Sequence, residues 1–523
     1  MKITKTEIKI FIMFFLISAF FIHWGGWYEN SVFSLTRAIV DERRFEIDSF
    51  ANQTSDRAYF NGHYYSDKAP LTSIVGIPSY VFSKSILGSE INKDVIKIFD
   101  NNKTALYAYK NPGTPFFTTM IVYTICTSVI FSALSVVVFY KILSYFFDKE
   151  KHKLILTFVC GFATLVFPYS LSVNVLPTAI FFLLLSFYFL LRQQKNHKLT
   201  ELLIAGIFLG VSFTADYTIG AAAFFMVFYV FLKTKSFNKT LVFFASFVIS
   251  LLPLMSYNYL LLHDPFTFMQ KYMDPNIFPA VPQEVFNLYG FLVPNVGVMY
   301  QVLIGLYRGL FFYYPILILS IVGLFYMLRD DAYKKEALLF LFVFIGYVVF
   351  NSARITWHGG YSFGPKYLYY TVPFLTIALG FAFKDFRYTS FKLVFVAFLC
   401  LSLFFNILSL QLMEDQIIDF NTLLIQDKYQ KITNSFGMLP NSLYGHYMPM
   451  FLQYGPKSMI IENLMSGHWD ADIRDIPFSR NWIYPYHSNV NMYWIYLLIL
   501  LIPIGIWFKE IVYLYKRKFH NYE

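Results

Sequence analysis

The sequence has few charged residues. Only 14% of its 523 residues are Asp, Glu, Lys or Arg, while 57% are hydrophobic and 21% are aromatic. Soluble domains carry about 25% charged residues, so this composition excludes an ordinary soluble protein. The net charge of +10 arises from Lys and Arg between apolar runs, without a basic stripe among stacking aromatics. We therefore expect a membrane protein whose contacts include membrane lipids, and no nucleic-acid partner.

Cysteine is also scarce. The three cysteines, Cys126, Cys160 and Cys400, lie in apolar segments far apart in the sequence. This spacing excludes a disulfide framework or a metal knuckle, and we interpret all three as packing residues. The sequence also lacks an internal repeat of about 20 to 50 residues and a glycine-rich phosphate loop, which excludes a solenoid or a P-loop enzyme.

Long apolar runs are the main feature of the sequence. At about 20 residues per span, they predict an all-α polytopic membrane protein with about twelve transmembrane helices. The first run ends without a small-residue cleavage site and is expected to remain as an anchor. Segment 69–88 is apolar but interrupted by Pro70 and Pro78, so we predict an interfacial or re-entrant helix there. The predicted spans are residues 8–28, 114–140, 153–171, 175–192, 201–217, 219–232, 240–262, 306–328, 336–351, 367–384, 391–412 and 493–514.

The basic residues predict the orientation of these spans. More than half of the Lys and Arg residues lie at the two termini and in the short loops of one side. Cationic loops resist translocation, so both termini are predicted to be cytoplasmic in a multi-pass protein of the cytoplasmic membrane. The long loops 29–113, 263–305, 352–366 and 413–492 then lie on the outer face, where we expect the chemistry. We expect a transmembrane bundle at 1–412, an outer subdomain at 413–492, and a last helix with a basic tail at 493–523.

The first outer loop concentrates carboxylates near the membrane. Residues 35–47 place apolar side chains in a pattern typical of a helix on the bilayer surface, which would hold acids at headgroup depth. For any single acid, solubility of a long loop is the more frequent explanation. The acids are Glu29, Asp41, Glu42, Glu46, Asp48, Asp56 and Asp67.

This loop resembles that of the GT-C glycosyltransferases, in particular the lipid A aminoarabinose transferase and the protein O-mannosyltransferases. The resemblance rests on an acid just after the first span, a surface helix and a signature in GHYYSDKAPL. Two later segments, RGLFFYYP at 308–315 and GGYSFGPKYLYYTVPF at 359–374, also resemble bacterial relatives. The matching elements of the first loop are Glu29, the helix around Thr36 to Phe45, and Gly62, Tyr65, Lys68, Pro70 and Leu71.

The resemblance implies transfer of a hexosyl or pentosyl group from a polyprenyl-phosphate sugar donor to an envelope glycan, lipid or protein acceptor. Family members usually carry Asp-Glu after the first span, whereas this chain has Tyr28-Glu29. The catalytic acid is therefore left open among Glu29, Asp56, Asp67 and Asp41.

Cations at the outer ends of spans are candidates for binding the donor phosphate. Lys68 is the strongest, because Pro70 and the apolar run after it fix its depth. Interfacial snorkelling explains the other cationic candidates equally well. Asp216 either contacts the donor sugar or caps a helix, and we favour the cap. The candidate substrate-binding residues are Lys68, Tyr65, Arg308, Arg354, His358 and Lys366.

Two further points stay open from the sequence. The last outer loop combines Trp and Tyr with Asp and Arg, which suits either an acceptor sugar or a membrane interface. Its HWDAD motif has too few ligands for a metal site by itself, so a divalent cation cofactor is neither assigned nor excluded. The alternative functions are a transporter or lipid flippase, and a noncatalytic scaffold or glycan polymerase.

Overall fold

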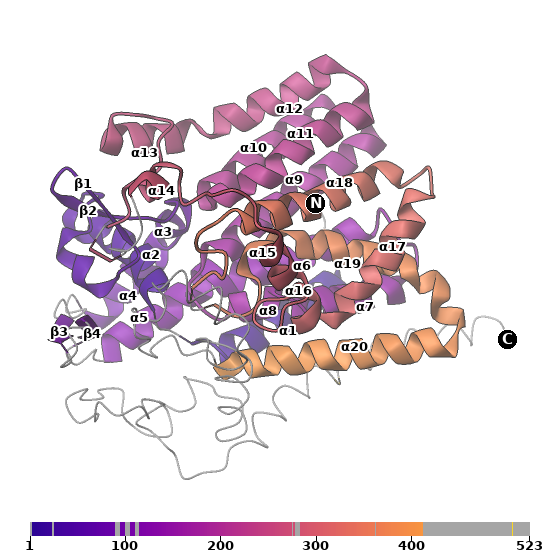
Figure 1. Ribbon diagram of the computed structural model, residues 1–523, viewed down its shortest axis with the longest axis horizontal. Helices are drawn as coiled ribbons and strands as arrows, with labels where there is room; N and C mark the ends of the chain where they lie inside the picture. Colours follow the sequence, from indigo (N-terminus) through magenta and orange to yellow (C-terminus); the bar gives the residue numbers. More distant parts are fainter. Residues whose placement is uncertain are drawn as a thin grey trace, which may run out of the picture.

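The structure is a computed structural model of a mostly helical protein (Figure 1). It describes residues 3–23, 26–88, 95–99, 105–109, 114–274, 276–277, 283–360, 362–411 and 505. The predicted outer loop 413–492 and the predicted span 493–514 lie outside these residues.

The N-terminal part alternates short helices with two hairpins; apart from α1, which lies in the bundle beside α6 (Ile130–Leu143), it gathers at one end of the molecule (Figure 1). Its elements are α1 (Lys5–Phe20), α2 (Trp27–Arg37), a π-helical turn η1 (Ala38–Glu42), η2 (Asp48–Gln53), β1 (Arg57–Phe60), β2 (His63–Ser66), α3 (Leu71–Val75), α4 (Ile77–Leu87), β3 (Val95–Phe99) and β4 (Ala105–Tyr109).

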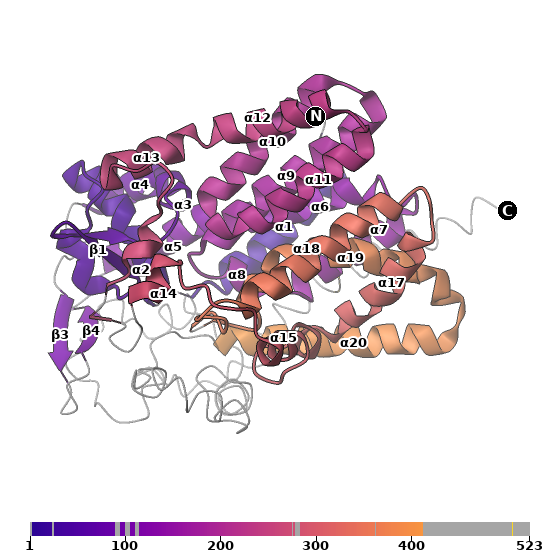
Figure 2. The ribbon, with the colours of Figure 1, turned by 45° about the horizontal axis from the view of Figure 1, so that its top comes forward.

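The middle of the chain forms long helices that run side by side (Figures 1 and 2). They are α5 (Thr114–Thr124), η3 (Ile125–Val129), α6 (Ile130–Leu143), α7 (Glu150–Phe162), α8 (Val166–Ser170), α9 (Val175–Asn196), α10 (Leu199–Ala215), η4 (Tyr217–Ile219), α11 (Gly220–Thr234), α12 (Phe237–Ser250) and α13 (Leu252–Leu262).

The remaining described elements pack against these helices, with α18 beside α11 and α19 beside α7. They are η5 (Met269–Tyr272), α14 (Gln283–Asn287), α15 (Val296–Leu303), α16 (Leu310–Tyr313), η6 (Pro315–Ile318), α17 (Leu319–Leu328), α18 (Lys334–Ser352), η7 (Lys366–Thr371), α19 (Val372–Phe381), η8 (Ala382–Arg387), α20 (Thr389–Leu408) and η9 (Ser409–Gln411).

Six helical segments of the described chain are long and apolar enough to cross a membrane. They are Thr118–Leu143, Val175–Asn196, Tyr217–Thr234, Phe237–Leu262, Lys334–Ser352 and Thr389–Leu408. Two shorter apolar helices, Leu199–Ala215 and Pro315–Leu328, overlap the predicted spans 201–217 and 306–328. The mostly helical, polytopic architecture is therefore confirmed, whereas the count of about twelve spans stays a prediction.

Several predicted spans are interrupted. The first helix ends at Phe20, and residues 27–28 already belong to α2, whose N-cap is Gly26. The predicted span 153–171 breaks between α7 and α8, where Pro168 occupies the first turn of the new helix. The continuous helix predicted from residue 306 begins only at Pro315, after the short α16. Proline at these positions lacks the N–H that a continuing helix needs.

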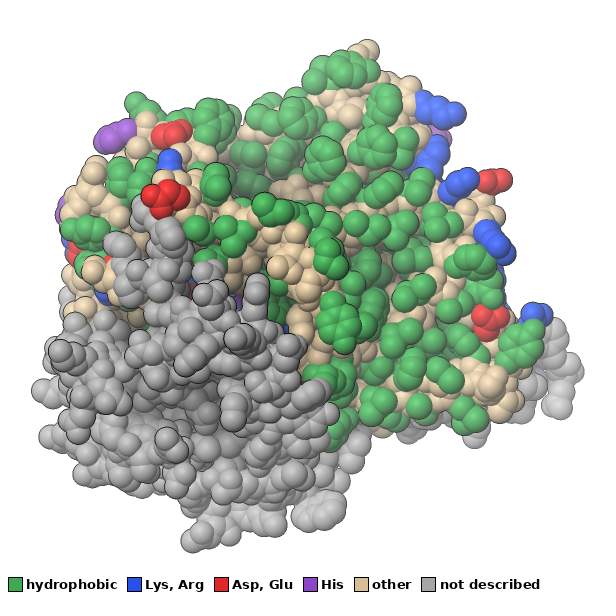
Figure 3. All heavy atoms as spheres, viewed as in Figure 1, with side chains coloured by type: hydrophobic (Ala, Val, Ile, Leu, Met, Phe, Trp, Pro, Cys, Tyr) green, Lys and Arg blue, Asp and Glu red, His purple; other side chains and the backbone are tan. Residues whose placement is uncertain are grey.

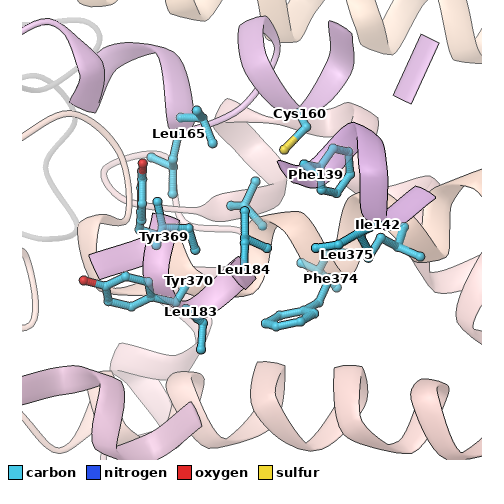
Figure 4. Close-up of a cluster of buried hydrophobic side chains, with 14 of the residues drawn as sticks. Phe139, Ile142, Cys160, Leu165, Leu183, Leu184, Tyr369, Tyr370, Phe374 and Leu375 are labelled. Atoms are coloured by element: carbon cyan, nitrogen blue, oxygen red, sulfur yellow. The ribbon is translucent and has the colours of Figure 1, made fainter. Parts of the chain in front are cut away.

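The core lies between helices that are distant in sequence. Figure 4 shows Phe139 and Ile142 of α6 with Leu183 and Leu184 of α9, next to Phe374 and Leu375 of α19 and Cys160 of α7. All seven side chains are buried, so they form part of the core that joins these helices. The outer surface is apolar as well, and Figure 3 shows hydrophobic side chains across the bundle face, which suits contact with lipid tails.

Charges gather at the ends of the bundle. In Figure 3, Lys and Arg side chains gather at the right-hand edge. Three acids near helix ends neutralise cations of the short loops: Lys141 pairs with Glu7 at 2.6 Å, Arg192 with Glu201 at 3.1 Å, and Lys233 with Glu336 at 2.6 Å. The short basic connections thus lie opposite the end that carries the first loop (Figure 1). Their assignment to the cytoplasm stays a prediction.

Candidate active site

A tight hairpin brings the acids of the first loop together. Strands β1 and β2 pair antiparallel, with Arg57 opposite Ser66 and Phe60 opposite His63. The connecting residues Asn61 and Gly62 both have positive φ, 50° and 87°, as a two-residue hairpin turn of mirror-image type requires. This register places Asp56 and Asp67 side by side just beyond the open end of the hairpin.

Lys68 joins these two acids. Its Nζ lies 2.8 Å from Oδ2 of Asp56 and 2.7 Å from Oδ2 of Asp67. The Asp67 carboxylate also accepts a 3.2 Å hydrogen bond from Ser31 on α2. The side chain of Asp67 is 6% exposed, that of Lys68 13%, and that of Asp56 25%. Asp56 is therefore the more accessible acid of this trio.

Burial sets the protonation behaviour of the trio. Burial raises the pKa of Asp67, and the charge of Asp56 adds to this effect, while the Lys68 ammonium opposes it. For Lys68, burial lowers the pKa, but the charges of Asp56 and Asp67 outweigh that effect, so its pKa lies above the ordinary value. Lys68 therefore stays charged and holds two carboxylates that would otherwise repel one another.

Helix α2 packs against the trio of Asp56, Lys68 and Asp67. Every residue from Glu29 to Arg37 is buried, so α2 is a packed element of the site and not an exposed surface helix. The backbone of α2 is tied to the strand entry, because Thr54 donates a 2.6 Å hydrogen bond to the Trp27 carbonyl and accepts one from the Asp56 N–H. The helix continues only to Glu42, because Arg43 takes a left-handed conformation. Phe45 and Ile47 thus lie outside the predicted helix.

Tyr28 connects Lys68 with a second lysine from a distant segment. Lys68 Nζ lies 4.4 Å from the centroid of the Tyr28 ring, and Lys366 Nζ lies 3.7 Å from the same centroid. These are cation–π distances. Burial lowers the pKa of Lys366, and the charge of Lys68 lowers it further. Members of the family that the chain resembles usually have an Asp at the position of Tyr28. The sequence analysis did not select Tyr28 as a candidate.

Glu29 is a further acid near Lys366. Burial lowers the pKa of Lys366, and the charges of Asp56 and, to a smaller extent, Glu29 oppose this effect. The side chain of Glu29 is 1% exposed, and its Oε2 has no hydrogen-bond partner within the described residues. Asp56 and Glu29 therefore both act electrostatically on Lys366, while Asp56 and Asp67 form the direct ion pairs with Lys68.

Asp41 is separate from this cluster. It accepts a 2.6 Å hydrogen bond from the Tyr80 hydroxyl and forms a 2.6 Å ion pair with Lys84 of α4. These contacts join η1 to α4, whose exposed Val81, Phe82 and Ile86 point away from the protein. Segment 69–88 is divided at Gly76, where an added Cβ would lie 2.2 Å from the Tyr123 ring. Its predicted interfacial or re-entrant position stays a prediction.

Arg354 packs against Tyr367, the residue that follows Lys366 in the chain. Its Cζ lies 4.5 Å from the centroid of the Tyr367 ring, and its Nε is buried without a hydrogen-bond partner in the described structure. Its guanidinium also lies 5.6 Å from the ring of Phe291 and 5.7 Å from that of Phe350. Arg354 is therefore held by aromatic rings.

Arg308 and His358 shape the loop before η7. Arg308 is fully buried and donates hydrogen bonds to the carbonyl oxygens of Ser362 and Gly360, the latter at 2.9 Å. Burial lowers the pKa of His358 to about 3, and the Arg308 charge adds to the effect. A neutral His358 can then accept the 3.0 Å hydrogen bond that its Nδ1 receives from the Gly360 N–H. Both side chains thus contribute to the folding of this loop.

Tyr65 and Asp216 have clear packing roles. Tyr65 on β2 lies in an apolar cluster with Leu254, Tyr257 and Met269, and burial raises its pKa to about 12, with Glu46 and Asp48 adding to the shift. Asp216 accepts a 2.9 Å hydrogen bond from the Thr218 N–H as the cap of η4, in line with the favoured interpretation. Asp216 also accepts a 2.7 Å hydrogen bond from the Tyr370 hydroxyl.

Sequence reasoning missed Tyr28, Ser31 and the hairpin. The Asn61-Gly62 dipeptide between AYF and HYYS was the available signal, since such dipeptides favour two-residue hairpin turns. Tyr28 and Ser31 carry no comparable signal, because their contacts depend on how α2 packs. Within the described residues, no group of three His, Cys, Asp or Glu side chains is arranged to hold a metal ion.

An apolar helical bundle with carboxylates and cations gathered at one end has the layout expected of a GT-C membrane glycosyltransferase. Residues 115–258 match the family model of dolichyl-phosphate-mannose-protein mannosyltransferases. This segment extends from α5 into α13, outside the first-loop signature, so it supports the GT-C resemblance independently. The match supports a membrane glycosyltransferase that uses polyprenyl-phosphate sugar donors in general. No curated protein matches the chain.

Proposed function

We propose that this protein transfers a sugar from a polyprenyl-phosphate donor to an envelope glycan, lipid or protein on the outer face of the cytoplasmic membrane. The observation that carries the proposal is the trio of Asp56, Lys68 and Asp67 at one end of the apolar bundle. Such a site offers a proton acceptor at the depth where a lipid-linked substrate carries its phosphate.

The reaction needs a base for the acceptor. The acceptor oxygen attacks the anomeric carbon, its proton passes to a carboxylate, and the bond between that carbon and the lipid phosphate oxygen breaks. We assign the proton acceptor to Asp56, because it is the most exposed acid of the trio and Lys68 fixes its position. General base catalysis of this kind contributes about 10²- to 10⁴-fold in rate.

Asp67 and Lys68 position this base. The Ser31 hydroxyl and Lys68 hold Asp67 in a buried place, so Asp67 is poorly exposed to an acceptor. Lys68 holds the carboxylate of Asp56 in place through their 2.8 Å ion pair. Asp41 is committed to Tyr80 and Lys84 and is no longer favoured as the base.

The test is bond formation by purified protein in liposomes. We would supply polyprenyl-phosphate mannose with radiolabelled sugar, together with an envelope extract as the acceptor mixture. The proposal expects labelled sugar on an acceptor and release of polyprenyl phosphate. Movement of the labelled lipid between leaflets without any transfer would instead favour the transporter or flippase.

A further inference from the structure

Lys68 has little capacity left for a substrate anion. An ammonium group has three donors, and two of them are used by Asp56 and Asp67 at 2.8 and 2.7 Å, while the Tyr28 ring lies at 4.4 Å. When both acids are ionised, the trio carries a net negative charge. A phosphate that approached Lys68 would be repelled by two carboxylates or would have to displace one of them.

Lys366 and Arg354 are in the opposite situation. Within the described residues neither forms an ion pair with a carboxylate, and both lie against aromatic rings: Lys366 on Tyr28 at 3.7 Å and Arg354 on Tyr367 at 4.5 Å. The buried Nε of Arg354 lacks a hydrogen-bond partner in the same part of the chain. Cations taken partly out of water without a direct ion pair are costly, and an incoming phosphate would offset that cost.

The fold fixes Lys366 in place. Gly359 has a φ of +74°, and an added Cβ there would lie 3.1 Å from Cβ of Lys366 and 2.8 Å from Oγ of Ser362. The Tyr28 ring that contacts Lys366 packs against the buried cluster that includes Val175 at the start of α9. Lys366 is therefore positioned by three distant parts of the chain.

We propose that Lys366 and Arg354 bind the phosphate of the lipid-linked donor, while Lys68 remains the counter-ion of the acids. This inference rests on the proposed function and assigns its phosphate contact. The leaving polyprenyl phosphate gains negative charge as its bond to the sugar breaks, and two cations nearby stabilise that charge. Tyr28, which contacts both lysines, is a positioning residue that keeps the phosphate site next to the base.

The test compares binding of geranylgeranyl phosphate with binding of geranylgeraniol to the full-length protein in detergent micelles. The two probes share the lipid chain, so the ratio of their affinities isolates the phosphate contribution. Lys366→Gln and Arg354→Gln should each lower this ratio about 10- to 100-fold, the usual effect of losing a charge-assisted hydrogen bond. Lys68→Gln should change it little.

Controls separate a lost contact from a lost fold. Lys366→Arg should retain most of the ratio, and thermal unfolding in the same micelles checks that each variant is folded. Lys271→Gln removes a matched lysine that lies 5.9 Å from the ring of Tyr272, and should leave the ratio unchanged.

The outcomes distinguish this inference from the proposed function. If the phosphate preference survives Lys366→Gln and Arg354→Gln but is lost in Lys68→Gln, the assignment is overturned and the glycosyltransferase proposal stands. If the wild-type protein binds the phosphate no better than the alcohol, the inference is overturned. The proposed donor class then also fails, unless the liposome assay still detects sugar transfer.

Discussion

The Lys68 ammonium lies 2.8 Å from Asp56 and thereby closes the open end of the β1–β2 hairpin. The same ammonium lies 2.7 Å from Asp67, which follows the second strand directly. One lysine therefore neutralises two acids that the strand register forces together, and the stability of the first loop depends on it.

Removing Lys68 should destabilise the protein strongly. Lys68→Met leaves two neighbouring carboxylates without a cation, and losing one member of a buried charge cluster costs about 3 to 5 kcal/mol. Asp67→Asn leaves a single Lys–Asp pair and should cost much less. Thermal unfolding in detergent measures both. The pair of Lys84 and Asp41 provides the control, because the Lys84 side chain is 33% exposed and Lys84→Met should therefore cost less than Lys68→Met. Equal stability of Lys68→Met and Lys84→Met would contradict this account.

The hairpin turn should be needed for activity. Gly62 has a φ of +87° with open space around its missing Cβ, so Gly62→Ala introduces backbone strain of about 1 to 2 kcal/mol without a clash. Gly88 is the control, with a φ of +85° and equally open space. Its ψ of 174° lies in a region almost reserved for glycine, so Gly88→Ala should lose at least as much stability as Gly62→Ala. Only Gly62→Ala should lower the rate of sugar transfer, because only Gly62 sets the register of Asp56 and Asp67.

Helices α10 and α12 should tolerate no side chain at Gly206. A Cβ there would lie 2.0 Å from Oγ of Ser246 and 2.3 Å from the carbonyl oxygen of Phe243. Gly206→Ala should therefore push the helices apart and cost about 1 to 3 kcal/mol in the free energy of unfolding. Gly220→Ala is the comparison, because the nearest atom is a Phe213 ring carbon at 3.3 Å. A Gly206→Ala protein as stable as Gly220→Ala would show that this contact is loose.

Binding of lipid phosphate should weaken with rising pH. Burial, followed by the Lys68 charge, lowers the pKa of Lys366, so its ammonium is present below that lowered pKa and is lost as pH rises through it. The affinity for geranylgeranyl phosphate should therefore begin to fall at a lower pH than about 10.4, the pKa of an ordinary lysine. In Lys366→Arg the affinity should stay constant over the same range. An alkaline limb that is identical in both proteins would rule out Lys366 as its origin.

The sequence predicted the class of architecture better than the details of the site. The apolar runs predicted the long helices, because the length and apolar composition of a segment are enough to identify it as a candidate membrane span. The breaks near Phe20 and Pro315 were less visible, since they depend on local backbone chemistry inside apolar stretches. Lys68, Asp56, Asp67 and Lys366 were named as candidates, but which of them meet could not be predicted. That grouping depends on the strand register and on Tyr28, whose ring joins segments far apart in the chain.

The most direct test of the central claim is the rate of sugar transfer in liposomes for Asp56→Asn. The account predicts a loss of about 10²- to 10⁴-fold, with the affinity for geranylgeranyl phosphate nearly unchanged, because Asp56 takes the acceptor proton and the phosphate lies elsewhere. Asp264→Asn removes an acid that caps a turn through Thr267 and Phe266, and should transfer sugar at the wild-type rate. A folded Asp56→Asn protein that transfers sugar as fast as the wild type would contradict the assignment of Asp56 as the base.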